Sequence, residues 1–348
     1  MHTRYPEFRA SGAPRALGRE IGEQLGEQIR GFCEIALAQV NRTMKVSRAN
    51  ALKVVHESIG LADGYASDMM AELRGTAEAA RVSLDDLMLL QVRNQLKADD
   101  AGCTSLALRG ERSGLVAQNW DNDPLLDPFT VVLTRRPEGK PAVTTVTQAG
   151  LIAYIGFNDA GIGLCLNTLP APSRTRGVPH YFTVRGIYES DSLEGAVAAV
   201  RRAERAIPAN IMLTTPQGPA DLEVTIDGVR VLTDERNRQV THTNHCRHPD
   251  LAAINQEFPE LIGSHARQAR IDTLLHSGAG RDDVAQVQAA LRDHDGHPRS
   301  ICRHPNDDLA HGHWCTVFSV IIEPSQRRML LTRGTPCNRE YEVYGMGK

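Results

Sequence analysis

The sequence predicts an α+β fold in which antiparallel sheets are covered by layers of helices. Residues 14–96 have the apolar spacing of helices, whereas short extended runs separated by turn signals begin near residue 99. Alternating blocks of strands and helices are typical of sheets packed against helices. No repeat, low-complexity segment or proline-rich linker interrupts the 348 residues, so we expect one compact unit.

The N-terminal part is expected to be helical. Helices are expected in a stretch with apolar residues every three to five positions from Leu17 to Leu37, then over 49–65, over 67–80 and from 84 to about 96. Ser83 is a suitable N-cap for the last of these helices, and Asp86 stands three residues later, where a capping box has Glu or Gln.

The remaining chain is expected to be rich in strands. Strands are expected over 104–109, 114–120, 130–135, 142–148, 151–158 and 161–167, then over 210–215, 222–231, 316–323 and 328–332, with helices over 192–206, 265–276 and 281–292. The links between the first six strands are too short for parallel crossovers, so we expect antiparallel pairing.

Composition excludes several classes of protein. The net charge of −3 lacks the basic surplus of a general nucleic-acid binder. No run approaches the roughly 18 apolar residues of a membrane span, and the first residues do not form a secretory signal. We therefore expect a cytoplasmic protein with no nucleic-acid or membrane partner.

Cysteine spacing indicates neither a disulfide framework nor a zinc ribbon. The chain has seven cysteines, an odd number at irregular spacing, and contains no Cys-x-x-Cys pair. These are Cys33, Cys103, Cys165, Cys246, Cys302, Cys315 and Cys337. The useful question is which thiol is reactive.

The junction between helices and strands contains a Gly102–Cys103 step. Gly102 leaves its carbonyl unshielded, and Cys103 is a strong nucleophile. Attack of the thiol on the Gly102 carbonyl would give a thioester, and water would release a new N-terminus. The freed α-amine, with a reference pKa of about 7.7–8.0, could act as base toward its own thiol. The alternative is an ordinary strand start with a buried thiol.

Four motifs resemble those of one enzyme family. They read GCTS at 102–105, QNWD at 118–121, TNH at 243–245 and SICRH at 300–304, and weaker matches cover 12–22 and 156–167. Their types and order resemble the isopenicillin N acyltransferase family, also known as acyl-coenzyme A:6-aminopenicillanic acid acyltransferases. The resemblance extends over nearly the whole chain.

The resemblance implies a fold and a maturation step. Members of this family are N-terminal nucleophile hydrolases, with two stacked antiparallel sheets between helical layers, an αββα sandwich. They are made as inactive precursors and cut themselves before the nucleophile. Here that cut falls between Gly102 and Cys103. A helical fragment, 1–102, and a catalytic chain, 103–348, would stay together as a heterodimer, and a homo-oligomer of such heterodimers is left open.

The resemblance also implies roles for individual residues. Cys103 would be the nucleophile and its α-amine the base, while Asn244 would donate to the oxyanion. Asp121 matches a carboxylate near the new amine, although a strand-end surface carboxylate is the alternative. Arg303 matches an arginine near the site, suited to a substrate carboxylate or to an internal ion pair.

Two further asparagines, Asn119 and Asn167, are expected to support the oxyanion or the substrate. Near 208–210 this chain has Ala209 where the family has a serine, so any helper role of that serine is absent or moved.

The predicted reaction passes through a thioester acyl-enzyme. Water would resolve it in an amidohydrolase, and an amine would resolve it in an acyltransferase. We favour hydrolysis of a small amide without a cofactor, since water needs no acceptor site, and acyl-coenzyme A use is the alternative. A β-lactam precursor, a β-alanyl amine, an N-acyl amino acid and a peptide all remain open as substrates.

Two other classes of protein compete with this interpretation. A zinc-dependent hydrolase is suggested by histidines and cysteines at 242–248, at 294 and 297, and at 311–315, but no His-Glu-x-x-His or zinc-finger spacing occurs. We therefore expect no metal. A binding module with a dead site is the other alternative, and the intact Gly102–Cys103 step argues against it.

Overall fold

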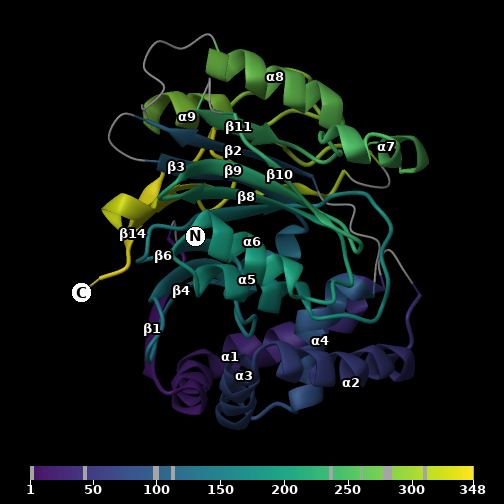
Figure 1. Cartoon of the computed structure of the whole chain (residues 1–348), viewed down its shortest axis with the longest axis vertical. Coiled ribbons are helices and arrows are strands. Elements are labelled where there is room, and N and C mark those ends of the chain that lie inside the picture. Colours follow the sequence, from purple (N-terminus) through teal and green to yellow (C-terminus); the bar gives the residue numbers. More distant parts are fainter. Residues whose placement is uncertain are drawn as a thin grey trace.

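Two stacked sheets form the centre of the molecule, and helices cover both outer faces (Figure 1). The computed structural model describes residues 4–41, 45–96, 102–110, 114–234, 238–258, 260, 262–276, 284–308 and 312–347. The αββα layering expected from the sequence is confirmed.

The first sheet has eight strands in the order β1-β4-β5-β6-β7-β8-β9-β10. These are β1 (Glu7–Gly12), β4 (Thr130–Pro137), β5 (Val143–Gln148), β6 (Ile155–Asn158), β7 (Gly163–Asn167), β8 (Ala209–Thr215), β9 (Gly218–Val224) and β10 (Val229–Leu232). From β4 onward every neighbouring pair is antiparallel, as expected.

Strand β1 corrects two expectations. It lies just before the helices expected over 14–96, in the 1–102 fragment that was expected to be helical, and it pairs with β4 in parallel, for example Phe8 beside Leu133. More than a hundred residues separate the two strands, which leaves room for the crossover that parallel pairing requires. Its short sequence, EFRASG, contains too few alternating apolar residues to predict a strand.

The second sheet has six strands in the order β11-β2-β3-β12-β13-β14, all antiparallel. These are β11 (Gln239–His242), β2 (Cys103–Arg109), β3 (Gly114–Asn122), β12 (Cys315–Glu323), β13 (Arg328–Leu331) and β14 (Glu342–Gly345). The sequence did not predict β11 or β14, and it merged β9 with β10. Each is only four to seven residues long, too short for a clear period.

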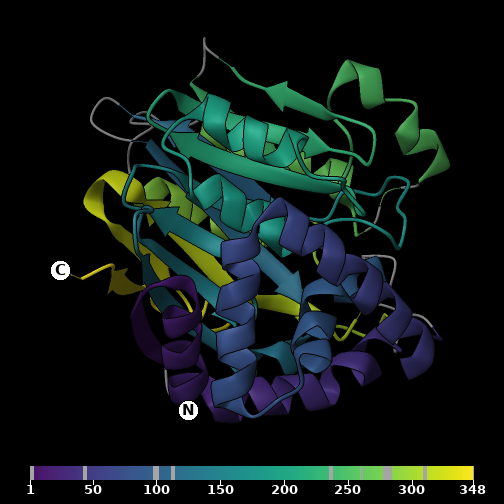
Figure 2. The same ribbon diagram turned by 60° about the horizontal axis from the view of Figure 1, so that its bottom comes forward.

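Six helices share an apolar core with the first sheet. They are α1 (Pro14–Val40), α2 (Arg48–Tyr65), α3 (Ser67–Ala80), α4 (Leu84–Val92), α5 (His180–Tyr188) and α6 (Leu193–Arg201). Figure 2 shows α1–α4 in purple and blue in front of the strands. The N-cap expected at Ser83 is present, because its Oγ accepts a hydrogen bond of 3.0 Å from the Asp86 amide. Helix α5 was not predicted from the sequence.

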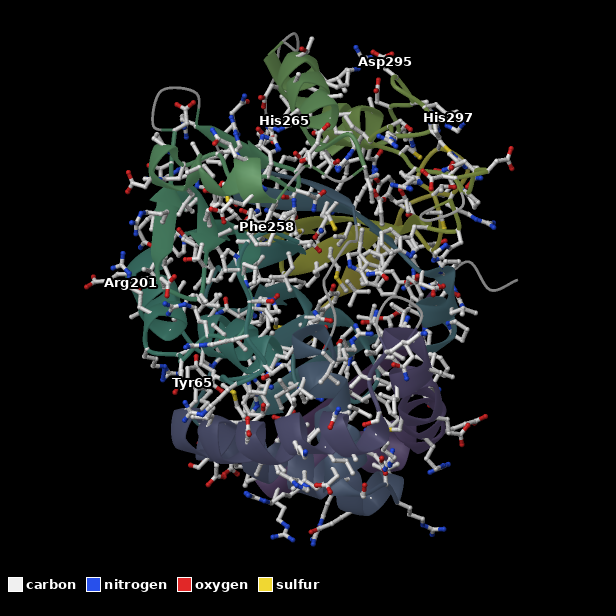
Figure 3. All side chains as sticks on the ribbon, turned by 90° about the vertical axis from the view of Figure 1, so that its right-hand side faces the viewer. Tyr65, Arg201, Phe258, His265, Asp295 and His297 are labelled. Carbon is white, nitrogen blue, oxygen red and sulfur yellow. The ribbon has the colours of Figure 1, made fainter. Side chains whose placement is uncertain are left out.

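The second sheet is covered on its outer face by α8 (Ser264–His276) and α9 (Val284–Leu291). Leu106 and Ala117 of the strands pack there against Ile271 and Leu291 of the helices. Figure 3 shows the two helical layers on opposite sides of the sheets, with Tyr65 in one and His265 in the other. The short α7 (Ile254–Glu257) precedes α8, and short 3₁₀ helices lie at Arg93–Gln95, Pro124–Phe129, Pro249–Leu251 and Pro324–Gln326.

Close backbone packing and a buried ion pair fix the N-terminal helices to the rest. A Cβ atom at Gly18 of α1 would collide with the Glu72 carbonyl of α3, so only glycine allows this approach. The Glu72 carboxylate in turn pairs with Arg135 of β4 at 2.8 Å and with Arg185 of α5 at 3.2 Å. Within the described residues, no helix is long and apolar enough to cross a membrane.

Candidate active site

Cys103 is the first residue of β2, and its side chain is buried at the edge of a small cavity. It pairs with Trp120 of β3, and the carbonyl of the preceding Gly102 accepts a hydrogen bond of 3.1 Å from the Asp121 amide. The Gly102–Cys103 peptide is therefore held in place by the sheet.

The cavity beside Cys103 has a volume of about 40 Å³ and a largely polar lining. Residues from both sides of the Gly102–Cys103 junction line it, among them Gln39, Arg93 and Asn94 before it, and Tyr154, Asn167, Thr168, His180, Tyr181 and Ala209 after it. Arg93 donates to the Tyr181 hydroxyl at 3.2 Å, so the two parts of the chain meet in this wall. Ala209 contributes only a methyl group to this wall.

Asn244 lies directly beside Cys103, as the sequence predicted. Its Oδ1 accepts hydrogen bonds from the Cys103 backbone nitrogen at 2.9 Å and from Arg267 at 2.8 Å. Because both partners are donors, the oxygen must face them, and the amide group of Asn244 then donates to the Thr168 carbonyl at 2.9 Å. Thr168 lines the cavity and Asn244 itself does not, so Asn244 is one hydrogen bond away from the cavity wall.

Arg267 of α8 is a site residue that the sequence did not reveal. Its guanidinium is buried and donates to the Cys103 carbonyl at 2.6 Å, to the Thr104 hydroxyl at 3.0 Å and to Asn244. Burial lowers its pKa, whereas the nearby Asp121 raises it. The planar guanidinium of Arg267 thus holds the start of β2 and the Asn244 side chain in fixed positions relative to each other.

Asp121 is fully buried on β3, which excludes the surface alternative considered for it. Its Oδ1 accepts a hydrogen bond of 2.7 Å from Thr316, while its Oδ2 has no hydrogen-bond partner among the described residues. That oxygen would lie 3.3 Å from a Cβ atom at Gly102, so it lies beside the junction peptide. Burial raises the pKa of Asp121 to about 6, against the opposing effect of Arg267.

Arg303 is buried near Asp121 and is tied to the same threonine. Its amide donates to the Thr316 hydroxyl at 3.0 Å, its carbonyl accepts from the Thr316 amide, and its Nε donates to the Trp314 carbonyl at 3.2 Å. Its charge lowers the pKa of Asp121. These contacts fit the internal ion-pair role better than a contact with substrate, since Arg303 does not line the cavity.

The two supporting asparagines come from different sheets, because Asn167 ends β7 of the first sheet and Asn119 lies on β3 of the second. Asn167 lines the cavity and donates to the carbonyls of His242 and Thr243 at 3.0 and 2.8 Å, which steadies the loop that holds Asn244. Asn119 instead donates to the carbonyls of Leu291 and Ile301 beneath α9. The structure therefore does not bring Asn119 to the cavity.

The thiol of Cys103 is protonated in the uncut chain. Burial, and next the Asp121 carboxylate, raise its pKa to about 12, and a hydrogen bond to Gln118 and the Arg267 charge oppose this only in part. A thiol with so high a pKa needs a base before it can attack a carbonyl.

The histidines at 242–248 have protein partners within this layer. The imidazole of His242 contacts Glu223 at 3.0 Å, and that of His245 contacts the Ser264 hydroxyl at 2.8 Å. His297 is exposed on a loop beyond α9 (Figure 3). His311 lies outside the described residues. Among the described residues, the ligand atoms of His242, Asp221 and Glu223 lie within 4.8 Å of one another, but all three residues are buried.

Comparison with known proteins gives a match over most of the chain. Residues 108–338 match the family model described as acyl-coenzyme A:6-aminopenicillanic acid acyl-transferase. The 40 kDa form of acyl-coenzyme A:6-aminopenicillanic-acid-acyltransferase from Emericella nidulans is 26% identical over 337 residues, 94% of this chain and 92% of that protein.

Two solved structures are also similar. A mutant of the conjugated bile acid hydrolase from Clostridium perfringens has 12% identity and a TM-score of 0.45, and covers 70% of this chain and 96% of that chain. Penicillin V acylase from Agrobacterium tumefaciens has 13% identity and a TM-score of 0.46, and covers 70% of this chain and 86% of that chain.

Proposed function

The chain belongs to the acyl-coenzyme A:6-aminopenicillanic acid acyl-transferase family, and from this premise we propose that it is a self-cleaving cysteine amidohydrolase acting on a small amide. The observation that carries the proposal is the arrangement around Cys103. Its thiol borders a polar cavity, and its backbone nitrogen donates to Asn244. Acyl transfer to an amine is the second outcome of the same chemistry.

Maturation begins with attack of the Cys103 sulfur on the Gly102 carbonyl carbon. A C–S bond forms and the C–N bond breaks, so the thiol proton moves to the leaving nitrogen and a thioester links the two residues. Water then hydrolyses the thioester, giving a Gly102 carboxylate and regenerating the Cys103 thiol beside a free α-amine. Asp121 supports this exchange, since its Oδ2 lies beside the junction and its pKa of about 6 allows it to carry a proton.

Catalysis then uses the new α-amine as the base. The amine takes the thiol proton while sulfur attacks the substrate carbonyl, and the ammonium returns that proton to the leaving amine. Asn244 holds the α-amine through Oδ1, and its amide group, which donates to the Thr168 carbonyl in the uncut chain, would donate to the oxyanion. Arg267 positions Asn244. Water resolves the thioester and releases the acid.

The size of the cavity supports an inactive precursor. A cavity of about 40 Å³ has room for a few water molecules only, whereas pockets for small ligands have about 300–1,000 Å³. Substrate access would therefore require the chain to rearrange at the junction after the cut. Hydrolysis is favoured over transfer because water needs no separate acceptor site.

The test is the mass of the purified protein, compared with that of two variants. We expect two fragments that add up to the chain plus one water, with Cys103 as the new N-terminal residue. Cys103→Ala should stay in one piece and be inactive, Cys103→Ser should be cut slowly, and Cys33→Ala should behave as wild type. Fully active wild-type protein in a single uncut chain would overturn the proposal.

A second measurement decides between the two outcomes of acyl transfer. The cleaved protein is given chromogenic amides, alone and with added amine acceptors or acyl-coenzyme A donors. Release of free acid supports the amidohydrolase, and formation of a new amide supports the acyltransferase. Loss of all turnover on thiol alkylation is expected in both cases. Activity that resists alkylation but is lost to a chelator would favour the zinc-hydrolase alternative.

A further inference from the structure

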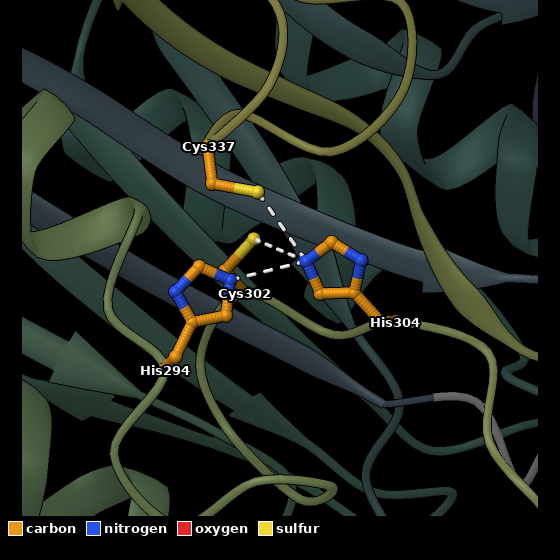
Figure 4. Close-up of side chains that lie close together, drawn as sticks. All are labelled: His294, Cys302, His304 and Cys337. Atoms are coloured by element: carbon orange, nitrogen blue, oxygen red, sulfur yellow. Dashed lines mark hydrogen bonds between the residues drawn. The ribbon is translucent and has the colours of Figure 1, made fainter.

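Two histidines and two cysteines converge at a point outside the candidate active site (Figure 4). His294 follows α9, Cys302 and His304 lie between α9 and β12, and Cys337 lies between β13 and β14. Their ligand atoms, two imidazole nitrogens and two sulfurs, all lie within 4.8 Å of one another. Cys302 is buried, His304 is half-buried, and the other two are exposed.

The Nε2 atom of His304 has more close contacts than one imidazole nitrogen can satisfy by hydrogen bonding. This atom lies 3.0 Å from the Nε2 of His294, 3.3 Å from the sulfur of Cys337 and 3.8 Å from the sulfur of Cys302. A neutral imidazole nitrogen has either one hydrogen or one lone pair, so it can form one such bond. A cation at the common point would instead take one lone pair from each of the four atoms.

We propose that His294, Cys302, His304 and Cys337 bind a structural Zn²⁺ ion. Zinc prefers nitrogen and sulfur ligands in a tetrahedron, in which bonds of about 2.0–2.3 Å place the ligand atoms roughly 3.3–3.8 Å apart. The contacts of 3.0, 3.3 and 3.8 Å surrounding His304 lie close to this range. Binding displaces one proton from each thiol, so two thiolates balance the charge of the ion.

The ligand-bearing segments are already held together without the ion. The Cys302 amide donates to the Asp293 carbonyl at 2.9 Å, next to His294, and the Ser300 hydroxyl donates to the Cys302 carbonyl at 2.7 Å. Arg292 donates to the Pro336 carbonyl at 2.8 Å, which places Cys337 beside the end of α9. Four protein ligands leave no open position, so the site is structural and not a hydrolytic centre.

The ion would also steady the candidate active site. Arg303 stands between the two ligands Cys302 and His304, and its backbone is bonded to Thr316, which donates to Asp121. Fixing the backbone on both sides of Arg303 therefore fixes this buried charge relative to Asp121. Cys103 takes no part in the cluster.

The experiment measures the metal content of the full chain, purified without chelator and then treated with excess zinc and desalted. We expect one zinc per chain in the wild type and in Cys33→Ser, and at least a tenfold loss in Cys337→Ser and in His304→Ala. Because Cys337 is exposed, its serine variant should fold, which circular dichroism checks. Exchange with Co²⁺ should give a thiolate charge-transfer band that is at least halved in Cys337→Ser, which keeps only the Cys302 thiolate.

Three results would overturn the proposal. The first is wild-type protein that holds no zinc after this treatment, and the second is a cobalt form without the thiolate band. The third is a disulfide between Cys302 and Cys337 in protein isolated under reducing conditions, seen as a mass two hydrogen atoms lower and resistance to alkylation. None of these readouts depends on self-cleavage or on catalytic activity, so the proposal stands apart from the proposed function.

Discussion

The side-chain oxygen of Asn244 accepts a hydrogen bond of 2.9 Å from the backbone nitrogen of Cys103. That nitrogen is an amide in the uncut chain and becomes the catalytic α-amine in the proposed mechanism. In that mechanism one asparagine would contact the same atom before and after the cut, and in the uncut chain its amide group donates to the carbonyl of Thr168, which lines the cavity. The contact between Asn244 and this nitrogen is thus present in the uncut chain.

Replacing Asn244 should lower turnover more than binding. We expect Asn244→Ala to reduce kcat by about 10²–10³, the usual cost of removing one oxyanion donor. Steady-state kinetics on the cleaved protein checks this, with the exposed Asn50→Ala as the control. A normal kcat with a raised KM would make Asn244 a uniform binding contact instead.

Arg267 should be essential although it does not line the cavity. Arg267→Lys loses the fork that reaches Cys103, Thr104 and Asn244 together, and we expect at least a tenfold fall in the rate of self-cleavage and in kcat. Arg270→Lys is the matched control, because this residue lies one turn later on α8 and pairs with Asp293 near the surface. Equal rates in the two variants would argue against the positioning role of Arg267.

Much of the fold could be predicted because long helices and strands show a clear periodic spacing of apolar residues. The helices over 49–65 and 67–80, the Ser83 cap and the long central strands agree with the structure within a few residues. Strand β1 could not be predicted, since its partner β4 lies more than a hundred residues away and only that pairing makes the segment extended.

Some residues of the candidate site could likewise be predicted from local sequence motifs, whereas others join it only through long-range packing. Cys103, Asp121 and Asn244 stand in motifs that can be read locally, and the structure brings them together. Arg267 is one of two arginines on α8, and nothing in the sequence around it shows that its side chain turns inward. Cys337 likewise joins the histidine cluster only through the packing of a loop 33 residues beyond His304.

Ionisation of Asp121 should make stability depend on pH. Because burial raises its folded pKa to about 6 from 3.8, the folded chain keeps a proton that the unfolded chain has released. The free energy of unfolding should therefore fall by about 3 kcal/mol as pH rises from about 4 to 6, because the two pKa values differ by roughly two units. It should stay at the lower value above about pH 6. Urea unfolding of Cys103→Ala across this range measures the slope.

The matched variant isolates the contribution of this carboxyl group. Other buried groups such as Asp221 also titrate, so the comparison is between Cys103→Ala and the same protein carrying Asp121→Asn. The neutral amide cannot ionise, and the part of the slope due to Asp121 should disappear. An unchanged slope in the double variant would show that the carboxyl of Asp121 does not titrate in this window.

The contact between α1 and α3 should decide how firmly the N-terminal helices are held. A Cβ atom at Gly18 would collide with the Glu72 carbonyl, and the same residue's carboxylate joins α3 to Arg135 of the first sheet. Gly18→Ala should therefore destabilise the chain by about 1–3 kcal/mol through overpacking. Gly60→Ala on α2 meets nothing within 4 Å and should instead be neutral or stabilise by about 0.4–1 kcal/mol. Thermal unfolding of both variants in the Cys103→Ala background checks the prediction, and equal melting temperatures would contradict it.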